Sequence, residues 1–182
     1  MILASSWNIL GGYAGQVNLG HAAFFGVGSL VARQLWSSGW PFAACFIAGG
    51  GAAIVLALLI GLPAFRLRGV YFAIGTLALA QILNVTVGNV LPEMSYIPDI
   101  AEYQLVPRYY LFLVLAVITI VAAHVMVNSR LGLGMKAVRE QEDAAESLGV
   151  SARKHKLMAL VASAFFAGLA GGALPTTTSA TT

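Results

Sequence analysis

A charged segment between two apolar stretches determines the fold of this chain. The segment reads SRLGLGMKAVREQEDAAESLGVSARKHK (Ser129–Lys156). The stretch before it is YYLFLVLAVITIVAAHVMV (Tyr109–Val127), and the stretch after it is LMALVASAFFAGLAGGAL (Leu157–Leu174). A helix of about 20 apolar residues crosses the hydrocarbon core of a bilayer. We therefore expect the segment to lie in water between two membrane spans, the second of which is slightly short.

The composition of the whole chain is that of an integral membrane protein. Of the 182 residues, 59% are hydrophobic and 9% are charged, against roughly 45–50% and 25% in a soluble domain. Ten of the seventeen Asp, Glu, Lys and Arg residues lie between positions 128 and 156, six of them basic. The net charge of +3 fits a basic cytoplasmic loop better than a nucleic-acid partner. A chain that concentrates its charge in this way is expected to use the segment to bind a partner.

Two further stretches, Pro41–Leu62 and Val70–Leu91, are also long enough to span. The chain is thus predicted to be an all-α, polytopic transmembrane bundle with one domain over residues 1–174. The last stretch ends at Pro175 and is followed by a low-complexity tail, residues 175–182. We expect the domain to be incomplete at its C-terminus.

The first block, Ile2–Gln34, is too short for two crossings and too long for one. Glycines and polar residues interrupt it, which predicts a helix, a broken or re-entrant element at Gly15–Gly20, and a second helix. Non-helical backbone at membrane depth requires protein or a water-filled cavity around it. Residues 22–35 should therefore be buried in the bundle or line a path.

The loop charges predict the orientation. The short loop with Arg66 and Arg68 and the long charged segment are basic and should face the cytoplasm. The loop at residues 92–108 carries three acids and one arginine and should face outward. The protein is then a multi-pass membrane protein.

Within the charged segment we expect an amphipathic helix, Met135–Leu148, that follows Gly132 and Gly134 and is capped by Gly149. Its apolar stripe consists of Ala137, Val138, Ala144, Ala145 and Leu148. Such a helix could lie on the bilayer surface, but surface anchors favour bulky apolar and basic residues. A stripe rich in alanine and bordered by acids fits a groove in another protein better.

Three blocks carry a resemblance to a known family. The run Asp143-Ala144-Ala145, followed after three residues by Gly149, resembles the EAA loop of ABC importer permeases, with Asp in place of the usual Glu. The wider segments resemble the branched-chain amino acid permeases of the LivM kind over roughly residues 2–174. These segments are WNILGGYAGQVNLGHAAFFGVGSL (Trp7–Leu30), LRGVYFAIGTLALAQI (Leu67–Ile82) and the run Ser129–Ala173.

The resemblance implies a permease subunit, in the bacterial inner membrane, of an ATP-driven importer for branched-chain or related amino acids. Its EAA helix would be the coupling helix that docks into a groove of a cytoplasmic ATPase. The implied partners are a homologous permease, two ATPase subunits and an extracytoplasmic binding protein. The residues implied to face the ATPase are Arg139, Glu142, Asp143, Ala144, Ala145 and Gly149.

The chain itself shows no enzymatic site. It lacks the GxxxxGK[ST] phosphate loop, so ATP would be bound by a partner. The histidines and Cys45 have no metal-ligand spacing, and no Ser/His/Asp or paired-carboxylate pattern is present. We therefore expect no cofactor, no metal and no catalysis.

Polar residues in the apolar regions are candidates for a translocation path. Gln16, Asn18 and His21 belong to the break, and Gln81 and Asn84 are three apart and share a helix face. For His21, a structural role in closing the following helix stays open. For Gln81 and Asn84, hydrogen bonds to neighbouring helices stay equally open.

The chain departs from the family in its outer loop and its ends. GNVLPEMSYIPDIAEY (Gly88–Tyr103) stands where the family usually has a TGGxxGL stretch. Family members usually continue with further helices at the C-terminal end and often have an additional helix before Trp7. The substrate therefore stays open, and urea or a short amide would fit as well. A channel or secondary carrier without an ATPase is the rival interpretation, although the spans lack the acids typical of ion-coupled carriers. A non-transporting scaffold is a third.

Overall fold

The computed structural model describes residues 1–65, 67, 69–90 and 105–173. All regular structure in these residues is helical, which confirms the all-α prediction. The elements are α1 (Ile2–Asn8), the π-helix η1 (Ile9–Tyr13), α2 (His21–Ser37), α3 (Phe42–Ala64), α4 (Val70–Val90), α5 (Leu105–Val127), α6 (Arg130–Glu140), α7 (Glu142–Ser147) and α8 (Ala152–Gly172).

The four predicted spans are confirmed. Among the described residues, α3, α4, α5 and α8 are long and apolar enough to cross a membrane. Helix α8 begins at Ala152 rather than Leu157, because its basic residues are good helix formers and continue the helix beyond the apolar stretch. The outer loop after Val90, where the sequence departs from the family, lies outside the described residues. The predicted low-complexity tail also lies outside them.

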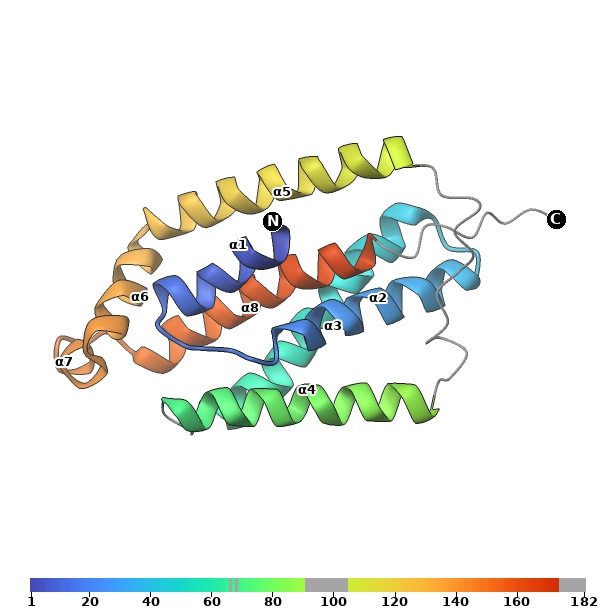
Figure 1. Ribbon diagram of the computed structural model, residues 1–182. Coiled ribbons are helices and arrows are strands. Elements are labelled where there is room, and N and C mark those ends of the chain that lie inside the picture. Colours follow the sequence, from blue (N-terminus) through green and yellow to red (C-terminus); the bar gives the residue numbers. More distant parts are fainter. Residues whose placement is uncertain (66, 68, 91–104, 174–182) are drawn as a thin grey trace.

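Helix α8 is the centre of the bundle. Buried residues make up 61% of its span, compared with 17% in α4 and in α5. It packs along α2 and α3, with α1 beside it and α5 beyond α1 (Figure 1). A Cβ on Gly28 would overlap the carbonyl of Gly168, and a Cβ on Gly168 would overlap the Ala53 side chain. Small residues therefore allow α2, α8 and α3 to make close backbone contact.

The N-terminal block has the predicted helix, break and helix. Residues 14–20 connect η1 to α2 without helical structure, and Gly15 adopts φ +68°. One face of α2 is buried through Phe24, Gly28 and Ala32, as expected of a helix that packs in the bundle. We call residues 14–20 the break.

The prediction of a single helix from Met135 to Leu148 is wrong. Gln141 adopts φ −156° and ψ 107° and separates α6 from α7. Gly132 and Gly134 lie within α6 and do not precede the helix. A Cβ on Gly132 would overlap the Val127 carbonyl, and a Cβ on Gly134 would overlap the His155 ring. These glycines permit close packing rather than breaking the helix. Gly149 adopts φ +83°, as expected of a C-terminal cap.

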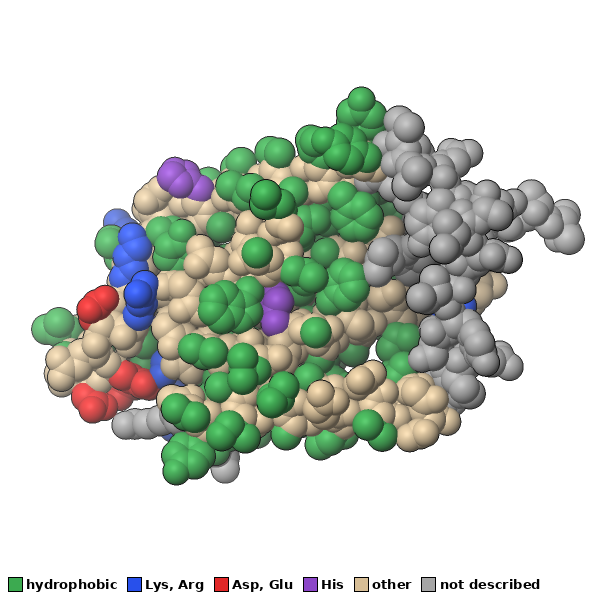
Figure 2. Space-filling model, viewed as in Figure 1, with side chains coloured by type: hydrophobic (Ala, Val, Ile, Leu, Met, Phe, Trp, Pro, Cys, Tyr) green, Lys and Arg blue, Asp and Glu red, His purple; other side chains and the backbone are tan. Residues whose placement is uncertain are grey.

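The charged end of the molecule is formed by α6 and α7. Figure 1 places the end of α3 and the start of α4 at this same end, as the predicted orientation requires. Figure 2 shows most of the visible Lys, Arg, Asp and Glu side chains gathered over α6 and α7, while hydrophobic side chains extend along the bundle. The side chains of Arg66 and Arg68 lie outside the described residues.

Candidate functional site

Helix α7 is attached to α8 through its inner face. The Lys156 Nζ atom lies 2.6 Å from Glu142 Oε2, and the two side chains are 8% and 28% exposed. Next to this ion pair, Val138, Ala145 and Ala152 form a small apolar cluster. The charged end is therefore a packed extension of the bundle and not a loose loop.

This packing divides the predicted apolar stripe. Val138 and Ala145 are buried, whereas Ala144 and Leu148 point outward, and Leu148 is 84% exposed. Ala137 is also exposed. The predicted stripe therefore does not form one surface.

The residues assigned to the ATPase contact are accordingly separated. Ala145 lies in the interior, and Glu142 is half-buried beside Lys156. Three of the assigned residues, Asp143, Ala144 and Gly149, are exposed at the end of α7, and Leu148, which was not assigned to the contact, is exposed beside them. We call these four residues the α7 tip.

Arg139 is exposed but turns toward the break. Its Nη1 atom donates a hydrogen bond to the Gly12 carbonyl at 2.5 Å. A Cβ on Gly15 would lie 2.8 Å from the Arg139 Cγ atom. The arginine thus joins the charged end to the chain before α2.

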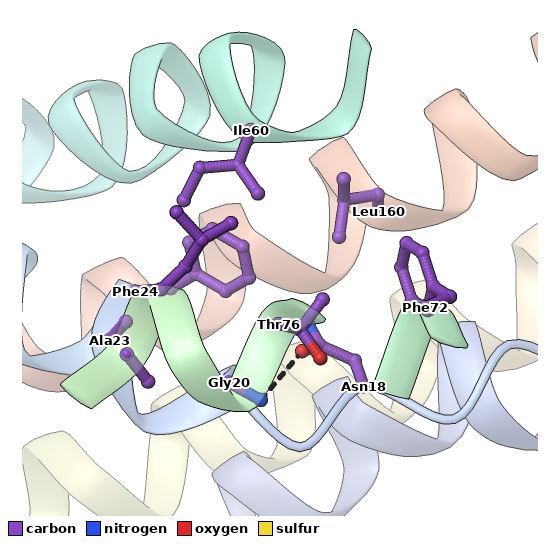
Figure 3. A pocket seen from close by; sticks show the side chains of 10 residues that line it. Asn18, Gly20, Ala23, Phe24, Ile60, Phe72, Thr76 and Leu160 are labelled. Carbon is purple, nitrogen blue, oxygen red and sulfur yellow. Dashed lines mark hydrogen bonds between the residues drawn. The ribbon is translucent and has the colours of Figure 1, made fainter. Parts of the chain in front are cut away.

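Asn18 is the most deeply buried polar side chain of the break. It is 2% exposed, and its Oδ1 atom accepts a hydrogen bond from the Gly20 N–H at 2.8 Å. Because a backbone N–H only donates, the atom that faces Gly20 is the amide oxygen. The Nδ2 atom has no hydrogen-bond partner, and Asn18 lines a cavity of about 10 Å³. Figure 3 shows this cavity between the break, α2, α3, α4 and α8.

A larger groove of about 510 Å³ lies between α2 and α4. Gln81 and Asn84 both line it, which confirms that they share a face. Ser29 adds a third polar side chain, and none of the described lining residues is charged. The small cavity adjoins the groove, because Ala23 and Ala80 line both.

His21 and Gln16 hold the break in place instead of lining the groove. The His21 Nε2 atom lies 2.9 Å from Ser6 Oγ, which is itself 3.0 Å from the Leu3 carbonyl. Since the Ser6 hydroxyl has one proton to give to Leu3, the His21 Nε2–H donates to Ser6. The Gln16 N–H donates to the Leu10 carbonyl at 3.2 Å and closes η1.

Comparison with known proteins identifies the family. The model of the family described as branched-chain amino acid transport system / permease component matches residues 1–182. The chain belongs to this family. With four helices among the described residues that are apolar enough to span, the chain is a multi-pass protein of the inner membrane.

Two curated relatives are LivM proteins, named high-affinity branched-chain amino acid transport system permease proteins. The one from Escherichia coli (strain K12) is 29% identical, and the one from Salmonella typhimurium is 28% identical. Each match covers 94% of this chain and 48% of the relative, so the chain spans about half of their length. No solved structure matches the chain.

Three contacts around the candidate site were not predicted from the sequence. Thr76 accepts a hydrogen bond from the Leu19 N–H at 3.2 Å and so attaches α4 to the break. Lys156 pairs with Glu142, and the Trp7 Nε1–H donates to the Asn18 carbonyl at 2.8 Å. A hydroxyl in an apolar span and a lysine at the start of one were visible signals, but their partners lie far away in the sequence.

Proposed function

We propose that this chain contributes the transmembrane part of an ATP-driven importer for branched-chain or related amino acids. The family match and the names of the relatives support this proposal. ATP would be bound and hydrolysed by cytoplasmic partner subunits. A homologous permease and an extracytoplasmic binding protein would complete the assembly.

The observation that carries the proposal is the exposed leucine of the α7 tip. Leu148 is 84% exposed at the end where the charged side chains gather. A leucine buried in a partner groove gains about 1.5–3 kcal/mol relative to exposure in water. Ala144 and Gly149 beside it allow close approach, and Asp143 and Glu146 supply a polar rim. The α7 tip therefore has the chemistry of a small protein contact.

The groove between α2 and α4 is the proposed site of passage. Its apolar walls suit an aliphatic side chain, and Gln81, Asn84 and Ser29 offer hydrogen bonds to the polar end of a zwitterion. The described residues that line the groove carry no charge, which disfavours an ion. The same groove would accept a short amide, so uptake of leucine and of urea should be compared.

Capture of the ATPase tests the proposed function. The purified chain, in lipid nanodiscs, is mixed with the cytoplasmic ATPase subunits of its host, and bound ATPase is quantified. We expect Leu148→Ser to reduce capture roughly tenfold, because about 1.4 kcal/mol of contact energy corresponds to a factor of ten. Leu133→Ser is the matched control, since Leu133 is 64% exposed on α6 outside the α7 tip.

The outcomes separate the alternatives. Loss of capture for Leu148→Ser with normal capture for Leu133→Ser supports the ATPase contact. Equal capture by both variants would show that the α7 tip is not the contact. No capture by the wild type would favour a carrier or a scaffold.

A further inference from the structure

We propose that Arg139 is a positioning residue that carries movement of α6 and α7 through the break to α4 and the groove. The inference rests on the proposed function for its biological meaning. The physical link is a series of contacts within this chain. It differs from transmission along α5 and α8, the spans on either side of the charged end.

The first contact joins α6 to the start of the break. Arg139 belongs to the last turn of α6 and donates a hydrogen bond to the Gly12 carbonyl in η1. Its stem lies against Gly15, so close that any side chain there would displace it. A shift of the end of α6 therefore moves the backbone at both glycines.

The second contact joins the end of the break to α4. The Leu19 N–H donates to Thr76 Oγ1, which in turn donates to the Ala73 carbonyl at 2.9 Å. A Cβ on Gly20 would overlap the Thr76 carbonyl. Thr76 is 5% exposed, so this attachment is enclosed by protein. The break is thus held by Arg139 at one end and by Thr76 at the other.

The break ends beside the groove. Leu19 lines the groove, and so do Leu77 and Ala80 on the turns of α4 that follow Thr76. Helix α4 is mostly exposed, with 17% of its span residues buried, whereas α8 is the buried centre. A movement of the charged end that reaches α4 and α8 would therefore displace α4 more easily than α8.

The Lys156–Glu142 pair supplies a fixed point for this movement. It attaches α7 to α8, while Arg139 attaches the end of α6 to the break. Force on the α7 tip would then turn α6 and α7 about the attachment to α8. The displacement would appear at Arg139 and at Gly12.

Hydrogen exchange of the chain in lipid nanodiscs tests the link without any ATPase. We expect Arg139→Gln to speed exchange of the Leu19 amide and of the first turns of α4 by roughly fivefold or more, the usual lower range of coupling between sites. Exchange in α3 and α8 should stay unchanged. Lys136→Gln, which removes an exposed positive charge from the same helix, should leave all these amides as in the wild type.

The reverse experiment uses the reciprocity of coupling. Thr76→Val removes the hydroxyl that accepts from Leu19, and it should speed exchange at Gly15 and at the end of α6. Thr76→Ser keeps the hydroxyl and should restore wild-type exchange. If Arg139→Gln also speeds exchange in α8, the comparison of Thr76→Val with Thr76→Ser decides whether α6 and α4 are linked through the break.

Unchanged exchange at Leu19 in Arg139→Gln, or unchanged exchange at the end of α6 in Thr76→Val, would overturn the inference. Either result would leave the proposed ATPase contact of the α7 tip unaffected. Conversely, failure of ATPase capture with positive exchange results would refute the proposed function and leave the physical link.

Discussion

Two adjacent alanines at the charged end have opposite surroundings. Ala145 is 3% exposed and packs with Val138 and Ala152, whereas Ala144 is exposed. Both belong to the run that resembles the EAA loop. Only Ala144 is available to a partner, and Ala145 holds α7 against α6 and α8.

Arginine substitutions should separate these two roles. Ala145→Arg forces a long charged side chain into a packed cluster and should lower the free energy of unfolding by more than about 2 kcal/mol. Ala144→Arg should unfold as the wild type does but reduce ATPase capture. Thermal unfolding in nanodiscs and the capture assay measure the two effects. Equal stability of the two variants would contradict the assigned burial.

At the level of the elements, helix packing depends on where glycines stand. Gly168 lies where α8 meets α3, and a Cβ there would overlap the Ala53 side chain. Gly51, also on α3, has nothing within 4 Å of its Cβ position. The same residue type is thus essential in one place and dispensable in the other.

Alanine substitutions test this difference. Gly168→Ala should destabilise the bundle by about 1–3 kcal/mol, the usual cost of overpacking. Gly51→Ala should be neutral or stabilise by about 0.5–1 kcal/mol, because glycine is unfavourable within a helix. Melting temperatures of the two variants in the same detergent measure both effects. A smaller loss for Gly168→Ala than for Gly51→Ala would be inconsistent with the close approach of α8 and α3.

The spans and the break could be predicted because their signals are local. Apolar length defines α3, α4 and α5, and the polar, glycine-rich run before His21 defines the break. The division of the charged segment at Gln141 could not be predicted, since glutamine is a good helix former. The helix was expected to begin after Gly132 and Gly134, yet the role of these glycines depends on contacts with Val127 and His155 that only the fold shows.

The candidate site was predictable in composition but not in arrangement. Gln81 and Asn84 line the groove as their spacing suggested. The partners of Arg139 and Glu142 lie 127 and 14 residues away, respectively, and periodicity gives no information on such contacts. Two residues assigned to an ATPase contact therefore proved to have contacts within the chain.

At the scale of the whole molecule, α8 is the central helix, and it runs from the charged end into the apolar part of the bundle. The charged end is attached to it by the Lys156–Glu142 pair, and α2 and α3 pack along it. The groove lies on the side of α2 and α4. This arrangement places the proposed ATPase contact at one end of the bundle and the proposed path along its side.

The most direct test of the account is photo-crosslinking from the α7 tip. A photo-crosslinking amino acid is placed at position 148 or, as the control, at position 133, and the chain is irradiated with the cytoplasmic ATPase subunits of its host. The account predicts a covalent adduct between the chain and an ATPase subunit from position 148 and little from position 133. An adduct from position 133 alone, or crosslinks from position 148 to lipid only, would contradict it.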